Sequence, residues 1–218
     1  MSSQTIADQV SVLSEHLAGH APAGVLEALN SEQAALNANG IPAGIPCPGT
    51  PLPDAELLNA RGNATTVADT RQDRPAVVVF YRGAWCPYCN IALRTYQAEL
   101  APELTRRGVE LIAISPQKPD GSLSMQETNN LTFTVLSDPG NQIAGRLGIL
   151  TAPSDAAAEA QASMGLDVAE HNADATRTIP MPTVIVVDAD GVIRWIDVHP
   201  NYTTRTEAQQ ILDAVDEL

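Results

Sequence analysis

The most regular part of the chain alternates short apolar runs with longer amphipathic segments between residues 76 and 147. Residues 76–81 and 109–115 are almost continuous in apolar side chains, which predicts two strands buried on both faces of a sheet. Residues 87–107 between them predict a helix. This strand–helix–strand order predicts two parallel strands at the centre of an α/β fold.

Weaker patterns predict the remaining elements of the C-terminal part. They are a strand at 65–67, a helix at 121–130, a strand at 133–136, a helix at 141–147 and a hairpin of strands at 183–187 and 192–198. The hairpin surrounds the Asp190-Gly191 pair, a dipeptide typical of tight turns. Thr204–Glu207 matches a capping box, which predicts a last helix from there to about Val215. Residues 150–178 are polar and alanine-rich, and indicate an insertion.

The N-terminal part has a different pattern. Apolar residues recur at helical spacing from Ile6 to Leu17, and a second helix is expected to start at Val25. Residues 40–53 hold five prolines and predict an extended arm. We therefore expect a helical extension and linker over residues 1–44. Residues 45–218 are expected to form one domain with a central mixed β-sheet flanked by helices.

Charge and composition narrow the function classes. The 218 residues carry a formal net charge of −14, which disfavours binding to nucleic acid or to an anionic membrane surface. No run approaches the roughly 20 apolar residues of a membrane span. Residues 1–17 lack the basic and apolar regions of a signal peptide. We expect a cytoplasmic protein.

The strongest chemical signal is the sequence Cys86-Pro87-Tyr88-Cys89 at the junction of a predicted strand and helix. A helix N-terminus offers free N–H groups and a partial positive charge, which favour a thiolate. Pro87 suits the first helical turn. The spacing lets both sulfurs lie on one helical face and form a disulfide. In the cytoplasm such a pair is typical of redox chemistry.

Other uses of these thiols have less support. A structural zinc site needs four ligands. The chain has no second Cys-x-x-Cys, and only His16 and His20, four positions apart on a predicted helix, could supply two more ligands, so no metal and no cofactor are expected. Inert buried thiols remain an alternative. The third cysteine, Cys47, is either a loop residue or a resolving thiol, within one chain or across a homodimer. Arg82 could lower a thiol pKa, and Trp85 and Tyr88 could shape the surface around the sulfurs.

Four segments together resemble one family of proteins. They are Phe80–Asn90, Ile179–Val184, Asp190–Arg194 and His199–Tyr202. They are similar to the peroxiredoxin-like proteins grouped with alkyl hydroperoxide reductase and thiol-specific antioxidant, which have the thioredoxin fold. The resemblance covers the chain from about residue 45 to its end, and the first 40 residues resemble a helical extension found in that group. It implies a thioredoxin-like fold with an oxidoreductase activity that serves antioxidant defence.

The resemblance implies two assignments of the site. By the thioredoxin pattern, Cys86 attacks a disulfide, Cys89 resolves it, and Pro182 is a cis-proline facing the pair. By the peroxiredoxin pattern Pro-x-x-x-Thr-x-x-Cys, Cys89 attacks peroxide, while Cys86 stands at the threonine position and Arg82 at the proline position. The family's later arginine falls near Pro182, so Arg82 or Arg177 would have to supply the cation.

Three functional hypotheses follow. The leading one is a thiol-disulfide oxidoreductase in which Cys86 attacks and cycles through a disulfide with Cys89. The second is a thiol-dependent peroxidase in which Cys89 reduces hydroperoxides, with Cys86 or Cys47 as resolving thiol. The third is a redox-sensing binding module. The expected partners are thiols or disulfides of proteins or small molecules, hydroperoxides, and a reductant such as thioredoxin or a low-molecular-weight thiol.

Overall fold

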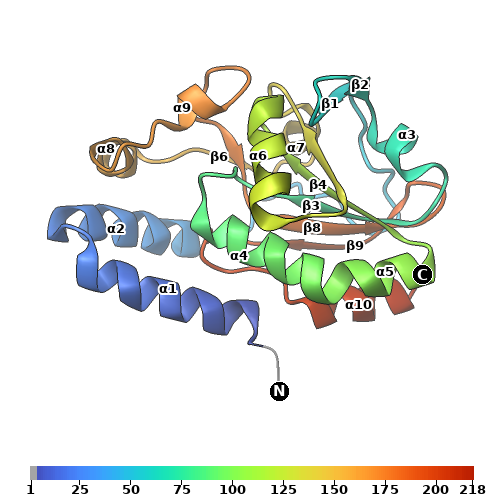
Figure 1. Cartoon of the computed structure of the whole chain (residues 1–218), viewed down its shortest axis with the longest axis horizontal. Helices are drawn as coiled ribbons and strands as arrows, with labels where there is room; N and C mark the ends of the chain where they lie inside the picture. The colour runs from blue at the N-terminus through green and yellow to red at the C-terminus, as the bar shows by residue number, and fades with distance from the viewer. Residues whose placement is uncertain (1–3) are drawn as a thin grey trace.

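The computed structural model describes residues 4–218 and has a seven-stranded sheet with helices on both faces (Figure 1). The strands lie in the order β2-β1-β5-β4-β3-β8-β9. Their bounds are β1 Leu57–Asn59, β2 Ala64–Thr65, β3 Ala76–Phe80, β4 Glu110–Ser115, β5 Thr134–Ser137, β8 Thr183–Val187 and β9 Ile193–Val198. β3, β4 and β5 are parallel, and the other pairs are antiparallel. The expected mixed α/β sheet is confirmed.

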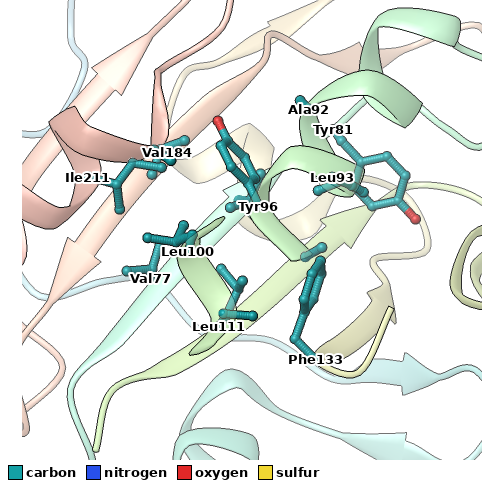
Figure 2. Close-up of a cluster of buried hydrophobic side chains, with 14 of the residues drawn as sticks. Val77, Tyr81, Ala92, Leu93, Tyr96, Leu100, Leu111, Phe133, Val184 and Ile211 are labelled. Atoms are coloured by element: carbon teal, nitrogen blue, oxygen red, sulfur yellow. The ribbon is translucent and has the colours of Figure 1, made fainter. Parts of the chain in front are cut away.

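Strand β3 divides the core, since all five of its residues are buried. Side chains alternate between the two faces of a strand. Val77, Val79 and Tyr81 therefore pack under α4 Pro87–Thr95, α5 Ala101–Arg107 and α10 Ala208–Asp216, while Ala76, Val78 and Phe80 face α7 Gln142–Arg146 and α3 Val67–Arg71. Figure 2 shows the first cluster, in which Tyr96 and Leu100 lie above the sheet. The continuous apolar run at 76–81 thus correctly predicts burial on both faces.

The predicted helix at 87–107 is interrupted. A π-helical turn at Tyr96–Leu100 separates α4 from α5. Such a turn carries one extra residue and is frequent near functional sites. Here Tyr96 is buried and its hydroxyl donates to the carbonyl of Thr206 at 2.6 Å, so the turn ties this helix to the segment before α10.

The N-terminal helices are confirmed as α1 Ile6–His20 and α2 Ala23–Asn39. They lie side by side, with α1 against α4 and α2 against α8 Asp155–Ser163 (Figure 1). The Glu207 carboxylate accepts the backbone N–H of Ile6 and of Ala7, each at 2.9 Å. Glu32 of α2 accepts the N–H of Ser154, which caps α8. These polar contacts hold the helical pair over one end of the sheet.

Residues 40–53 form the expected extended arm, which runs beside the hairpin of β8 and β9. Gly49 donates to the carbonyl of Ile193 at 2.8 Å, and Pro51 forms a bridge with Val192.

The segment 150–178 is more ordered than an insertion suggests. It contains β6 Leu150–Thr151, α8 and α9 Val168–His171, and β6 pairs with β7 Ile179–Pro180. α6 Pro119–Asn129 covers the sheet near β5 and β1.

Three local predictions are wrong. The strand at 65–67 stops at Thr65, because Thr66 caps α3 by accepting the N–H of Asp69. Strand β1 was not predicted, since three residues give too short a pattern. The last helix begins at Ala208, after a capping box of Glu207 and Gln210 instead of Thr204–Glu207. The Thr204 hydroxyl is used instead by Asn201 and His199.

Within residues 4–218, no helix is both long and apolar enough to cross a membrane.

Candidate redox site

The two cysteines lie at the junction between β3 and α4. Cys86 is the N-cap of α4, and Pro87 occupies the first helical turn, where a missing N–H is harmless. The backbone N–H groups of Cys89 and Asn90 both donate to the carbonyl of Cys86 at 3.1 Å. Both thiols are free and buried, with exposed fractions of 1% for Cys86 and 0% for Cys89. The predicted setting of the pair at a helix N-terminus is confirmed.

The loop before the pair is held by amide side chains. Asn90 donates to the carbonyls of Ala84 at 2.7 Å and Cys86 at 2.9 Å, and receives a bond from Asn129. Gln117 accepts the N–H of Ala84. Gly83 packs so closely that a Cβ there would overlap the side chains of Trp85 and Gln117. This packing fixes the direction in which the thiols leave the sheet.

Cys89 is the thiol with a cation against it. Nη2 of Arg205 lies 3.2 Å from Cys89 Sγ, and Nη1 of the same guanidinium donates to the carbonyl of Thr204 at 2.6 Å. Burial raises the pKa of Cys89. The hydrogen bond from the Cys86 thiol, the Arg205 charge and the backbone N–H of Arg82 outweigh it, so the pKa lies well below the usual thiol value. Cys89 is therefore the thiolate of the pair.

Cys86 has the opposite electrostatic character. Burial raises its pKa, and its hydrogen bond to Cys89 and the negative charge there raise it further, above the usual thiol value. The charges of Arg82 and Arg205 only partly oppose this effect. Cys86 thus keeps its proton and donates a hydrogen bond to the Cys89 sulfur.

A small cavity adjoins Cys89. Its volume is about 10 Å³, and it is lined by Arg205, Pro182, Thr183, His199 and Tyr96, among others. A cavity of this size has room for about one water-sized molecule. The thiolate therefore has an enclosed space with a positive charge beside it.

A larger groove lies on the Cys86 side. It has a volume of about 260 Å³, and Cys86, Tyr88 and Arg82 form one wall of it. Leu17, Leu26 and other residues of the two N-terminal helices form the opposite wall. Cys89 does not line this groove among the described residues. The two sulfurs thus face different spaces.

Arg82 lies between two aromatic rings. Its guanidinium carbon is 4.0 Å from the ring centre of Tyr202 and 5.0 Å from that of Trp85. The side chain is buried, and its Nε has no hydrogen-bond partner among residues 4–218. Trp85 is half-buried and Tyr88 is buried, so both shape the groove wall.

The remaining predicted residues fall in different places. Pro182 lines the cavity at Cys89, but its preceding peptide bond is trans, because no peptide bond of the described chain is cis. The cis-proline prediction is wrong. The backbone on both sides is held extended: Met181 donates to Ile149 and Pro182 accepts from His199. Arg177 is exposed and lines a separate cavity beside α8.

The structure does not bring Cys47 to the pair. Cys47 is exposed and lies two residues before Gly49, which bonds to Ile193 at the start of β9. That position is level with Ala76, at the end of β3 far from Cys86, because β9 and β3 both pair with β8. Five strand residues separate the two ends by about 16 Å.

Arg205 is the functional residue that sequence reasoning missed. It stands 116 positions after Cys89 and three after Tyr202, where the recognised segment His199–Tyr202 ends. Thr206 helps to hold this segment in place, because its hydroxyl donates a hydrogen bond to Asp197. The Asp197 carboxylate is also hydrogen-bonded to His199. The hydrogen bond from His199 lowers the pKa of Asp197, although burial raises it. In the sequence, Arg205 was read only as part of a helix cap.

Within residues 4–218, no group of three or more His, Cys, Asp or Glu side chains is placed to hold a metal ion.

Comparison with known proteins gives consistent results. Residues 48–196 match the model of the AhpC/TSA family. The Escherichia coli K12 protein named peroxiredoxin Bcp is 30% identical over 111 residues, which cover 51% of this chain and 67% of that protein. A Mycobacterium tuberculosis H37Rv protein also named as a peroxiredoxin is 33% identical over 96 residues. That match spans 44% of this chain and 60% of the length of the relative.

Solved structures show the same fold. The crystal structure of peroxidoxin BcpB from Mycobacterium tuberculosis has a TM-score of 0.59 and 19% identity, over 78% of this chain and 97% of that one. A reduced peroxiredoxin of Vibrio vulnificus in complex with hydrogen peroxide has a TM-score of 0.63 and 20% identity, over 78% and 99%. The thioredoxin-like, peroxiredoxin-type fold expected from the sequence is confirmed.

Proposed function

Because this chain belongs to the AhpC/TSA family, we propose that it is a thiol-dependent peroxidase in which Cys89 attacks a hydroperoxide and Cys86 resolves the product. The observation that carries the proposal is the 3.2 Å contact between Arg205 Nη2 and Cys89 Sγ. It makes Cys89 the thiolate, and the thiolate is the nucleophilic form of cysteine. The sequence-based hypothesis of first attack by Cys86 has less support, because burial raises the pKa of that thiol.

In the first step, the Cys89 thiolate attacks one peroxide oxygen and the O–O bond breaks. Cys89 becomes a sulfenic acid, and the leaving oxygen takes a proton to become water or an alcohol. The Arg205 guanidinium lies where negative charge passes from sulfur to oxygen, so it can stabilise that charge during transfer. The cavity of about 10 Å³ beside the sulfur suits a water-sized reactant.

In the second step, the Cys86 sulfur attacks the sulfenic sulfur of Cys89. A Cys86–Cys89 disulfide forms and water leaves, with the proton of the Cys86 thiol and the hydroxyl of the sulfenic acid. Both sulfurs come from one motif, so the cycle needs neither Cys47 nor a second copy of the chain. A thiol reductant then returns the pair to the dithiol form, as expected in the cytoplasm.

The test uses Cys86→Ser and Cys89→Ser, both in a Cys47→Ser background that removes the exposed thiol. Each protein is mixed with hydrogen peroxide and then with a sulfenate-trapping dione, and the adduct is located by mass spectrometry. We expect the adduct on Cys89 in the Cys86→Ser protein and none on Cys86 in the Cys89→Ser protein. An adduct on Cys86 alone, or no oxidation of either thiol, would contradict the proposal.

Thiol-disulfide exchange is the second candidate function. The observation in its favour is that Cys86, and not Cys89, lines the groove of about 260 Å³. A disulfide substrate in that groove would meet Cys86 first. A mixed disulfide trapped at Cys86 in the Cys89→Ser protein, without peroxide consumption by the wild type, would favour this candidate.

A further inference from the structure

The groove beside Cys86 has features that the peroxidase step does not use. It is about 26 times larger than the cavity at Cys89, with volumes of about 260 and 10 Å³. Its far wall consists of side chains from α1 and α2, including Leu17, Leu26 and Leu29. Residues Met164 and Leu166 close it from the α8 side. A mostly apolar space of this size is at the small end for ligand pockets.

Arg82 gives the groove a positive charge next to the reacting sulfur. Its buried Nε has no hydrogen-bond partner, and no carboxylate forms an ion pair with it within residues 4–218. The nearby acid, Glu32, lines an adjoining cavity together with Arg82, but it forms no ion pair with Arg82 and accepts the N–H of Ser154 through Oε1. An unpaired buried cation is costly, so the site is suited to an anionic group of a ligand.

The way in which a thiol reduces a disulfide indicates which kind of ligand would use this groove. In a Cys86–Cys89 disulfide, an attacking thiolate must reach one sulfur and displace the other. Only Cys86 faces the groove, so attack from the groove falls on Cys86 and displaces Cys89. Cys89 leaves as a thiolate against Arg205, and a thiol with a low pKa is the better leaving group.

We propose that the groove is the binding site for the reductant of the Cys86–Cys89 disulfide, and that this reductant is a low-molecular-weight thiol with an apolar body. Its thiolate contacts Arg82, and its carbon chain packs between the N-terminal helices. This inference rests on the proposed function, which supplies the disulfide. A protein reductant such as thioredoxin would have to displace α1 or α2 to bring its sulfur to Cys86, which is 1% exposed.

The step balances as an exchange of two electrons. The thiolate RS⁻ attacks Cys86, forming an R–S–S–Cys86 mixed disulfide and releasing the Cys89 thiolate. A second thiol, from the same or another reductant molecule, attacks the mixed disulfide and releases Cys86, which takes up a proton. The reductant leaves as its disulfide.

The experiment forms the disulfide with diamide, so that it does not depend on reaction with peroxide. Mercaptoalkanols of three, four and six carbons are then added, and release of the Cys89 thiolate is followed by absorbance. Because the thiol group is the same in each, we expect the second-order rate constant to rise by about threefold to fourfold for each methylene that becomes buried. Equal rate constants across the series would overturn the proposal.

Two variants locate the effect. Ala18 lines the groove, so Ala18→Trp fills it and should abolish the dependence on chain length. Ala35 is exposed on α2 and does not line the groove, so Ala35→Trp is the matched control and should retain the dependence. Faster reduction by thioredoxin than by six-carbon thiol at equal concentration would also overturn the proposal. If peroxide fails to oxidise Cys89 but the chain-length dependence is seen, only the peroxidase function is lost.

Discussion

Cys86 and Cys89 are separated by only two residues, yet they line two spaces that differ in size and polarity. On the Cys89 side, the cavity is small, carries the positive charge of Arg205, and is also lined by His199 and Thr183. On the Cys86 side, the groove is large and lined by apolar residues of the N-terminal helices. An enclosed charge stabilises a thiolate, while an apolar groove binds a carbon chain. This difference is the basis of our proposal that oxidation and reduction use different sulfurs.

The largest expected effect comes from removing the cation on the Cys89 side. Arg205→Gln should lower the rate of Cys89 oxidation by hydrogen peroxide by about 10²- to 10³-fold, as for loss of one oxyanion donor. Stopped-flow fluorescence measures this rate. Arg205→Lys keeps a charge and should recover part of it. Arg194→Gln removes an exposed arginine that pairs with Asp188, and it should leave the rate unchanged. A wild-type rate of Cys89 oxidation in Arg205→Gln would show that the charge of Arg205 does not distinguish the Cys89 side from the Cys86 side in this reaction.

The hydrogen bond between the sulfurs should have the next largest effect. Cys86→Ala removes the donor to the Cys89 thiolate, which should raise the pKa of Cys89 toward the usual thiol value. Cys86→Ser keeps a hydroxyl donor and should raise it less. Thiolate absorbance against pH measures both values. Equal pKa values in the two variants would show that this hydrogen bond does not lower the pKa of Cys89.

The wild-type pH dependence follows from the same contacts. Because the pKa of Cys89 lies below the usual thiol value, the thiolate persists at pH values below the ordinary thiol range. The rate constant for peroxide should therefore stay constant through the ordinary thiol range, and fall only when the pH drops below the lowered pKa. Stopped-flow rates over a pH series test this. A rate that halves near pH 9.0, where an ordinary thiol ionises, would contradict it.

A smaller effect is expected on the wall of the groove. Glu207→Ala removes the acceptor for Ile6 and Ala7 and the cap of α10, and should lower the free energy of unfolding by about 1–2 kcal/mol. Hydrogen exchange should also increase in α1. Glu217→Ala, at the exposed end of α10, is the control. Unchanged exchange in α1 would show that Glu207 does not hold α1 in place beside the groove.

The smallest effect should come from Cys47→Ser. Since Cys47 is exposed and lies at the other end of the strands, stability should change by less than about 0.5 kcal/mol. Disulfide formation after peroxide should also be unchanged, as measured by non-reducing mass spectrometry. Loss of the Cys86–Cys89 disulfide in this variant would make Cys47 part of the cycle.

Regular elements were predictable where the chain carries a long periodic pattern. The buried strand β3, the helices α1 and α4, and the hairpin of β8 and β9 were each found where expected. The short strand β1 and the π-helical turn at Tyr96–Leu100 were not, since both depend on packing across the sheet. The division at residue 44 stays a prediction, although the family match begins at residue 48.

By itself, the sequence determined the fold class and the candidate redox pair, because strand–helix periodicity and the position of Cys86-Pro87-Tyr88-Cys89 are local properties of the chain. Only the tertiary structure decided which sulfur is the thiolate. That choice depends on Arg205, which is 116 positions from Cys89 along the chain and 3.2 Å from it in space. Electrostatic energy depends on distance in space and on burial. A linear pattern carries neither quantity, so Arg205 could be recognised only once the fold had brought it to Cys89.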